Sequence, residues 1–146
     1  SNDGVVLLYI GDKFEGGNNV RRAYSTDGGW TFEFDRGGIL GDETSVGPNA
    51  YVDQKILSLG NGRWRLVTMK QGTVYTFISE DDGYSFIYEG KILSPQDFSP
   101  EYNLTTLNDP KMILLPDGRF RIYVTGIEES DSDGIPPQHI FSATSK

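Results

Sequence analysis

One stretch of the chain occurs twice and decides the fold: residues 53–67 read DQKILSLGNGRWRLV, and residues 109–123 read DPKMILLPDGRFRIY. The two copies align without a gap at an offset of 56 residues. Each copy has an apolar run, an Asn-Gly or Asp-Gly pair, and a second apolar run. Both central residues of a type I′ turn need positive φ, which Asn, Asp and Gly tolerate best, so this pattern favours a β-hairpin. We therefore predict type I′ turns at residues 61–62 and at residues 117–118.

A second motif follows these hairpins and also occurs twice. Residues 25–32 read STDGGWTF and residues 79–86 read SEDDGYSF, so both fit Ser-x-Asp-x-Gly-x-Thr/Ser-aromatic. Ser and Asp side chains in such a turn bind nearby backbone amides, and the final aromatic ring packs between strands. We therefore expect a structural role for the shared residues, which are Ser25, Asp27, Gly29, Thr31 and Phe32 in the first copy and Ser79, Asp81, Gly83, Ser85 and Phe86 in the second.

Short runs rich in Val, Ile, Tyr, Phe and Thr lie between Gly, Asn, Asp and Pro residues along the chain. No long stretch shows the apolar period of an α-helix, so we expect an all-β fold with antiparallel strands. The candidate strands are Val5–Ile10, Val20–Tyr24, Trp64–Met69, Thr73–Ile78, Phe120–Thr125 and His139–Ala143.

The repeats arrange these strands in units of four: strand A, an Asn/Asp-Gly turn, strands B and C, an Asp-containing turn, and strand D. A four-stranded antiparallel unit of about 50 residues has the size of a β-propeller blade. The first copy lacks strand A and the last lacks strand D. We therefore expect a β-propeller segment of about three blades with three, four and three strands, at about residues 1–48, 49–104 and 105–146.

The Ser-x-Asp-x-Gly-x-Thr/Ser-aromatic motif resembles the Asp-box of sialidases and of other carbohydrate-active propellers. Residues 23–32 are also similar to a stretch of invertase- and levanase-type five-bladed hydrolases, and Asn108–Lys111 to the Asp-Pro strand start of that clan. The resemblance implies a sialidase-like propeller that processes or recognises carbohydrate, with glycoside hydrolysis as its enzymatic activity. It also implies a secreted or periplasmic location. The alternative is a non-catalytic propeller module that binds glycan or protein, or that serves structural assembly.

The resemblance makes Asp53 and Asp109 the candidate catalytic residues. In related propellers strand A is the innermost strand, and its start borders the axial cleft where sugar binds. Glycoside hydrolysis needs two carboxyl groups roughly 5 to 9.5 Å apart. The alternative is that each Asp caps its strand or bonds the backbone of a neighbouring blade. Glu101 and Tyr102, in the loop before Asp109, are candidate substrate-binding residues, and the alternative for them is an ordinary surface loop.

Composition excludes several classes of function. The formal net charge of −8 opposes binding to nucleic acid and to anionic lipid. No apolar run is long enough to insert in a membrane. The chain has no cysteine and a single histidine, which excludes thiolate and multi-histidine metal sites. The acidic residues 128–134 lack the spacing of a calcium loop, so we expect a solvated loop there. We therefore expect carbohydrate as the partner, with no cofactor and no metal.

A propeller segment leaves strand edges and blade faces without partners. We therefore expect a homo-oligomer, or the remainder of a longer chain, to close the ring. A two-fold dimer would supply six blades, the number typical of sialidases.

Overall fold

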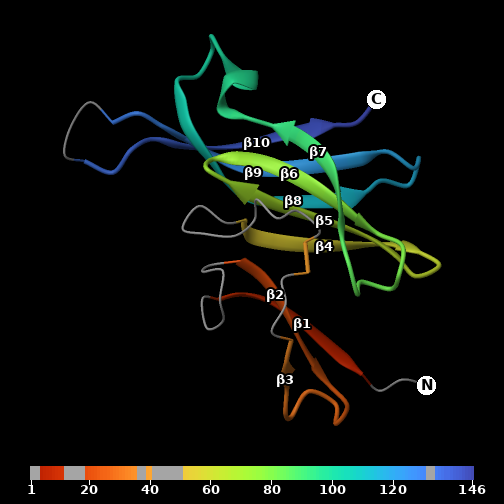
Figure 1. Ribbon diagram of the computed structural model, residues 1–146. Coiled ribbons are helices and arrows are strands. Elements are labelled where there is room, and N and C mark those ends of the chain that lie inside the picture. The colour runs from red at the N-terminus through yellow and green to blue at the C-terminus, as the bar shows by residue number, and fades with distance from the viewer. Residues whose placement is uncertain (1–3, 12–18, 36–38, 41–50, 131–133) are drawn as a thin grey trace.

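The computed structural model describes residues 4–11, 19–35, 39–40, 51–130 and 134–146, which form three antiparallel sheets with no α-helix among them (Figure 1). The first sheet contains β1 (Val5–Gly11), β2 (Asn19–Ser25) and β3 (Glu33–Phe34). The middle sheet contains β4 (Val52–Gly60), β5 (Arg63–Lys70), β6 (Thr73–Ser79) and β7 (Ile87–Leu93). A 3-10 helix, η2 (Pro95–Phe98), leads to the last sheet of β8 (Leu104–Leu114), β9 (Phe120–Glu128) and β10 (Gln138–Thr144).

This arrangement confirms the predicted all-β fold class. Within each sheet every strand pairs with the strand that follows it in the chain, and the sheets hold three, four and three strands. All six candidate strands lie within observed strands. None of the three sheets closes on itself among the described residues. No helix in the described part of the chain has the length and apolarity needed to span a membrane.

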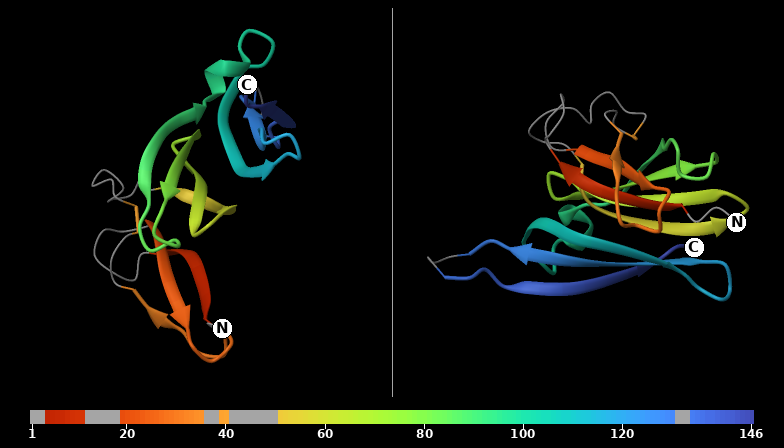
Figure 2. Two further views of the ribbon diagram at one scale, coloured as in Figure 1. Left: turned by 90° about the vertical axis from the view of Figure 1, so that its right-hand side faces the viewer. Right: turned by 90° about the horizontal axis from the view of Figure 1, so that it is seen from below.

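The middle sheet is covered on both faces, and two further views show the three sheets following one another in chain order (Figure 2). The core between the first and middle sheets includes Val20, Leu66, Phe77 and Phe86, and the core between the middle and last sheets includes Val67, Val74, Leu107 and Ile122. Successive residues of a strand point to opposite faces. Leu66 and Val67 therefore enter different cores, and residues 66–69 are buried without interruption. Each large apolar side chain buried in this way stabilises the fold by about 1.5–3 kcal/mol.

The two repeated hairpins differ in their turns. Asn61 and Gly62 have φ values of 53° and 74°, as the predicted type I′ turn requires. The same prediction for residues 117–118 is wrong, because only Gly118 has positive φ there. Pro116 fixes its own φ near −65°, and the Gly118 amide donates to the Leu115 carbonyl at 3.0 Å. The result is a three-residue loop in which Gly takes the left-handed position after a type I turn.

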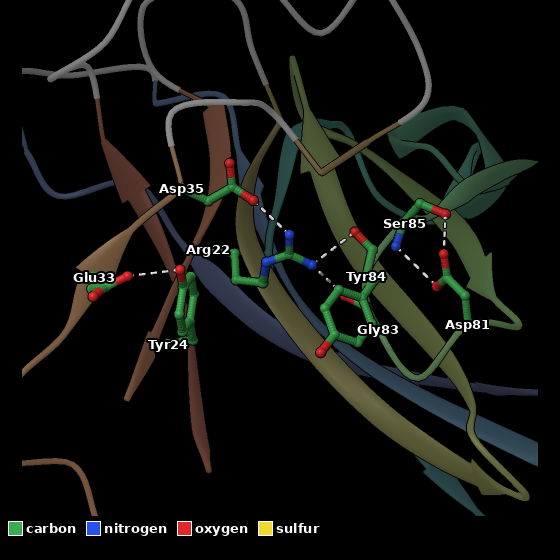
Figure 3. A network of polar contacts seen from close by, with 8 residues as sticks. All are labelled: Arg22, Tyr24, Glu33, Asp35, Asp81, Gly83, Tyr84 and Ser85. Carbon is green, nitrogen blue, oxygen red and sulfur yellow. Dashed lines mark hydrogen bonds and ion pairs between the residues drawn. The ribbon is translucent and has the colours of Figure 1, made fainter. Parts of the chain in front are cut away.

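Arg22 ties the first sheet to the turn that follows β6 (Figure 3). Its Nη1 donates a hydrogen bond to the Tyr84 carbonyl at 2.8 Å, and its Nη2 donates to Asp35 Oδ2 at 2.5 Å. The guanidinium carbon lies 5.0 Å from the centre of the Tyr84 ring. The side chain is 14% exposed, so these charge-assisted contacts are partly shielded from water. They fix the position of the first sheet beside the middle one.

Candidate functional site

Asp53 and Asp109 occupy the same β-bulge in successive sheets. The pairing of β4 with β5 skips residues 53–54, which together face a single residue of β5. The pairing of β8 with β9 skips residues 109–110 in the same way. In both strands an Asp is the first of the two extra residues. β-bulges are over-represented next to active sites, where they redirect a side chain.

Both aspartates also have a left-handed backbone, with φ of 55° at Asp53 and 50° at Asp109. This conformation costs an ordinary L-residue about 1–2 kcal/mol, although Asn and Asp tolerate it better than most. It persists only where the surrounding structure fixes it, and such positions cluster at functional sites. Both copies of the repeated stretch therefore have an Asp in the same left-handed conformation at the same position.

Hydrogen bonds and burial restrain the backbone at the two bulges. Gln54 Nε2 donates to the Leu8 carbonyl of β1 at 3.1 Å, and the buried Thr68 Oγ1 donates to the Val52 carbonyl at 2.6 Å. Pro110, the residue after the second Asp, is fully buried. Within the described ranges, by contrast, no hydrogen bond or ion pair engages the carboxylate of Asp53 or that of Asp109. The fold fixes the main chain and leaves both carboxylates to other partners.

The two bulges lie at the same end of adjacent sheets, on both sides of the turn that joins β5 to β6. On one side, Val52 pairs with Met69, two residues before this turn. On the other side, the Leu107 amide donates to the Gly72 carbonyl at 3.0 Å. Leu107 precedes Asp109 by two residues, and Val52 precedes Asp53 by one. The structure therefore brings Asp53 and Asp109 to the same end of adjacent sheets.

The position of Asp109 within its strand differs from the prediction. Asp53 is the second residue of β4, close to the strand start as expected. Asp109 is the sixth residue of β8, because β8 begins at Leu104, where it pairs with Glu128. The strand therefore begins five residues before the repeated stretch, and its ladder has a first irregularity between Leu104 and Thr106, ahead of the Asp109 bulge.

The predicted substrate-binding pair separates into two environments. Glu101 is exposed to solvent. The Tyr102 ring packs against Phe141, with ring centres 4.8 Å apart, and against His139, with ring centres 5.2 Å apart. His139 Nε2 lies 3.1 Å from Glu128 Oε1. Tyr102 thus belongs to an aromatic group on the last sheet, and a role of Glu101 or Tyr102 in sugar binding stays a prediction.

The two repeated turns have matching hydrogen bonds. Ser25 Oγ accepts from the Gly29 amide at 2.9 Å, and Asp27 accepts from the Thr31 amide and the Thr31 hydroxyl. The second turn repeats this pattern: Ser79 Oγ accepts from the Gly83 amide at 2.9 Å, and Asp81 accepts from the Ser85 amide and hydroxyl (Figure 3). The carboxylates of both turns are therefore engaged, unlike those of the bulges.

These hydrogen bonds predict that acid weakens the fold. The Ser25 hydroxyl, with Thr31, holds the pKa of Asp27 well below its ordinary value, and the Ser85 hydroxyl lowers the pKa of Asp81 to about 2. A carboxyl with a lower pKa in the folded state binds more protons when unfolded, so its stabilisation is complete above the unfolded pKa and disappears as pH falls through the folded pKa. We expect the free energy of unfolding to fall between about pH 4 and pH 2. Urea denaturation across that range measures the slope, which Asp81→Asn should flatten. An unchanged slope in that variant contradicts the prediction.

Sequence reasoning missed the left-handed bulges. A residue before proline is normally extended, so the Asp109-Pro110 pair pointed away from a positive φ. The turn between the predicted strands Trp64–Met69 and Thr73–Ile78 was expected, but not the positive φ of both Gln71 and Gly72 in it. Gly72, which tolerates a positive φ, was the feature of the sequence that could have indicated this geometry.

No group of three or more possible metal ligands occurs among the described residues, and positions 131–133 of the acidic loop lie outside them.

Comparison with known proteins supports the fold alone. Neither a protein-family model nor a curated protein matches the sequence. An endo-1,4-β-xylanase from Bacteroides thetaiotaomicron VPI-5482 is similar over 99% of this chain and 46% of its own, with a TM-score of 0.60 and 14% identity. A second structure, described as a glycoside hydrolase, is similar over 88% of this chain and 31% of its own, with a TM-score of 0.52 and 17% identity. The chain thus spans less than half the length of each of these proteins.

Proposed function

We propose that this chain is a segment of a β-propeller of the glycoside hydrolase type, in which Asp53 and Asp109 are the carboxylates that act on sugar. The paired bulge carries the proposal. Two aspartates share one strained conformation at the same end of adjacent sheets, and the described residues leave both carboxylates unengaged. Gly normally occupies a position with a left-handed backbone when no side chain is required there for binding or catalysis. An Asp at both positions is therefore better explained by what its carboxylate does.

Two such carboxylates perform the chemistry that a glycosidic bond requires. One, protonated, gives its proton to the leaving oxygen as the bond to the anomeric carbon breaks. The other attacks that carbon directly when the carboxyls are about 5–5.5 Å apart, or removes a proton from an attacking water when they are about 6.5–9.5 Å apart. Water supplies the oxygen of the new hemiacetal in both cases, and the released alcohol keeps the proton. We propose that one of Asp53 and Asp109 is the general acid and the other is the nucleophile or general base, and we do not assign which residue has which role.

Further predictions belong to the same proposal. The three sheets are successive propeller blades, and the Ser/Asp turns are Asp-boxes that stabilise the outer rim. Glu101 and Tyr102 contact the sugar beyond the two carboxylates. A second copy, or further polypeptide, closes the ring. The similarity in fold to two glycoside hydrolases supports these predictions at a coarse level.

The test is a panel of 4-nitrophenyl glycosides, including a β-xyloside, an α-arabinofuranoside, a β-galactoside and an α-sialoside. The 146-residue protein is assayed, and its mass in solution is measured on the same sample. We expect nitrophenol release from at least one substrate, by an assembly larger than one chain. If the assembled protein releases nothing from any substrate, the hydrolase proposal fails.

The second candidate is a non-catalytic module that binds glycan. Two exposed aromatic rings, Trp30 and Tyr84, favour it, because Trp and Tyr are enriched at binding interfaces. Retention of the protein by a polysaccharide, with no release from any glycoside, would identify this second function.

A further inference from the structure

Both Ser/Asp turns carry an exposed aromatic ring at the same place. Trp30 and Tyr84 each follow the Gly and precede the Thr or Ser of the motif. Trp30 is 89% exposed and Tyr84 is 69% exposed. The turn uses only the backbone of this position: the Trp30 amide donates to Asp27 Oδ1 at 3.0 Å, and the Tyr84 amide donates to the Asp81 carbonyl at 3.4 Å. Neither the turn nor the core therefore requires an aromatic ring here.

The two rings stand on rigid supports. Side-chain hydrogen bonds close both turns, so the main chain at Trp30 and at Tyr84 is fixed before any ligand arrives. Arg22 adds a second restraint at Tyr84, since it binds the Tyr84 carbonyl and lies over the ring. Groups that are already ordered lose less conformational entropy when they bind.

Hydrogen-bonding groups lie on the first sheet beside Arg22, whose guanidinium reaches the second ring (Figure 3). Tyr24 is 43% exposed, and its hydroxyl donates to Glu33 Oε2 at 2.7 Å. Glu33 is exposed and lies directly opposite Tyr24 across the β2–β3 pair. Because Arg22 reaches from β2 to Tyr84, this part of the first sheet meets the turn of the middle sheet. The surface therefore combines aromatic faces with hydroxyl and carboxylate groups.

This surface is separate from the two bulges. β6 begins at Thr73, directly after the Gly72 turn that adjoins the bulges, and ends at Ser79, where the second Ser/Asp turn begins. Seven residues of extended strand span roughly 20 Å. The turns that follow β2 and β6 lie at the same end of neighbouring sheets (Figure 1). The second Ser/Asp turn thus lies at the opposite end of the middle sheet from the Gly72 turn, which adjoins both bulges.

The charges of the surface select among possible ligands. Carboxylates of Glu33, Glu80 and Asp82 surround the turns and are all exposed. The nearby guanidinium of Arg22 is already engaged by Asp35 and by backbone carbonyls, and that of Arg63 pairs with Glu80 at 3.5 Å. The surface therefore repels polyanions such as uronate polymers and nucleic acids. Aromatic faces carry negative charge and attract the C–H groups of a sugar ring, while carboxylates accept hydrogen bonds from its hydroxyls.

We infer that Trp30 and Tyr84, with Tyr24 and Glu33, form a binding surface for a neutral polysaccharide. This inference rests on the proposed function for the choice of carbohydrate. It adds that the ligand is an uncharged polymer, and that the protein binds this polymer at a second site about 20 Å from Asp53 and Asp109. A polymer held there stays near the carboxylates between successive cleavages.

Affinity electrophoresis of the full chain in native gels tests the inference. The probes are soluble xylan, arabinan and mixed-linkage β-glucan, with polygalacturonate as the anionic control. We expect at least one neutral polysaccharide to retard the wild-type protein and polygalacturonate not to. Trp30→Ala and Tyr84→Ala should each weaken binding about tenfold, and the double variant should migrate as it does without polymer. Trp30→Phe and Tyr84→Phe should keep most of the binding, because they keep a ring.

Ile135→Ala is the matched control, since Ile135 is also 89% exposed but lies outside both turns. It should bind as the wild type does. No retardation by any neutral polysaccharide overturns the inference, as does equal retardation of the wild type and the double alanine variant. Retardation by polygalacturonate alone overturns the choice of a neutral ligand. Hydrolysis without retardation refutes this inference only, whereas retardation without hydrolysis refutes the catalytic proposal and leaves the binding surface standing.

Discussion

Replacing Asp53 or Asp109 by Asn is expected to lower kcat/KM for the best aryl glycoside by about 10²–10⁴-fold, the usual contribution of a general acid or base. Asn keeps the shape of the side chain and tolerates the left-handed backbone, so the bulge should survive. The decrease in kcat/KM then measures the contribution of the carboxylate alone. The measurement is the initial rate of nitrophenol release at several substrate concentrations, which separates an effect on kcat from one on KM.

Replacing the same residues by Gly tests whether they serve the fold instead. Gly removes the left-handed penalty of about 1–2 kcal/mol but makes the unfolded chain more flexible, at a cost of about 0.5–1 kcal/mol. Because no described residue bonds either carboxylate, we expect the free energy of unfolding to stay constant or to rise slightly. A loss of activity with no loss of stability is the signature of a functional residue. A residue that caps its strand would instead lose about 1 kcal/mol or more on becoming Gly.

Asp82 is the matched control for both substitutions. It has a φ of 61°, so its backbone is also left-handed, and it lies in the second Ser/Asp turn. Its Oδ1 accepts a hydrogen bond from Trp64 Nε1 at 3.1 Å. Asp82→Gly should therefore be less stable than the Gly variants at Asp53 and Asp109, because it also loses this hydrogen bond, and should keep activity. The same result at all three aspartates would refute the assignment.

The sequence predicted the hairpins and the sheets well because local chemistry determines them. Asn61-Gly62 takes one two-residue turn geometry, and the Ser/Asp turns are closed by side chains only two to four residues away. Alternation along a strand predicts which residues enter a core. It does not predict which sheet covers each face. Burial of both Leu66 and Val67 depends on sheets that come from distant parts of the chain.

The same limit explains the errors. Pro116, one residue before the Asp-Gly pair, replaced the expected type I′ turn at residues 117–118 with a longer loop, although the two repeats align without a gap. The start of β8 depends on its pairing with the far end of β9, which the repeated stretch does not contain. The φ of Asp53 and Asp109 depends on contacts that fix the bulge from neighbouring strands, such as that of Gln54 with Leu8. Each of these features is determined by residues that lie outside the short sequence motif from which the prediction was made.

Gly72→Ala is expected to destabilise the fold by about 2–5 kcal/mol. Gly72 has a φ of 71°, and an added Cβ would lie 2.7 Å from Thr106 Oγ1 and 3.0 Å from Thr106 Cα. The left-handed backbone contributes about 1–2 kcal/mol, and the steric overlap adds about 1–3 kcal/mol because the main chain of β8 must move. The melting temperature should fall by about 10 °C for a chain of this size.

Gly118→Ala separates these two contributions. Gly118 has a φ of 84° but nothing lies within 4 Å of its added Cβ, so only the backbone penalty of about 1–2 kcal/mol applies. Equal melting temperatures for the two variants would show that β8 does not approach the Gly72 turn as closely as the structure indicates. Because this turn lies between Asp53 and Asp109, pushing β8 away also changes the separation of the two carboxylates. Gly72→Ala should therefore reduce hydrolysis even at temperatures where it is fully folded, since a displacement of about 1 Å costs up to about 10²-fold in rate. Gly118→Ala, at the far end of the β8–β9 hairpin, should leave the rate unchanged.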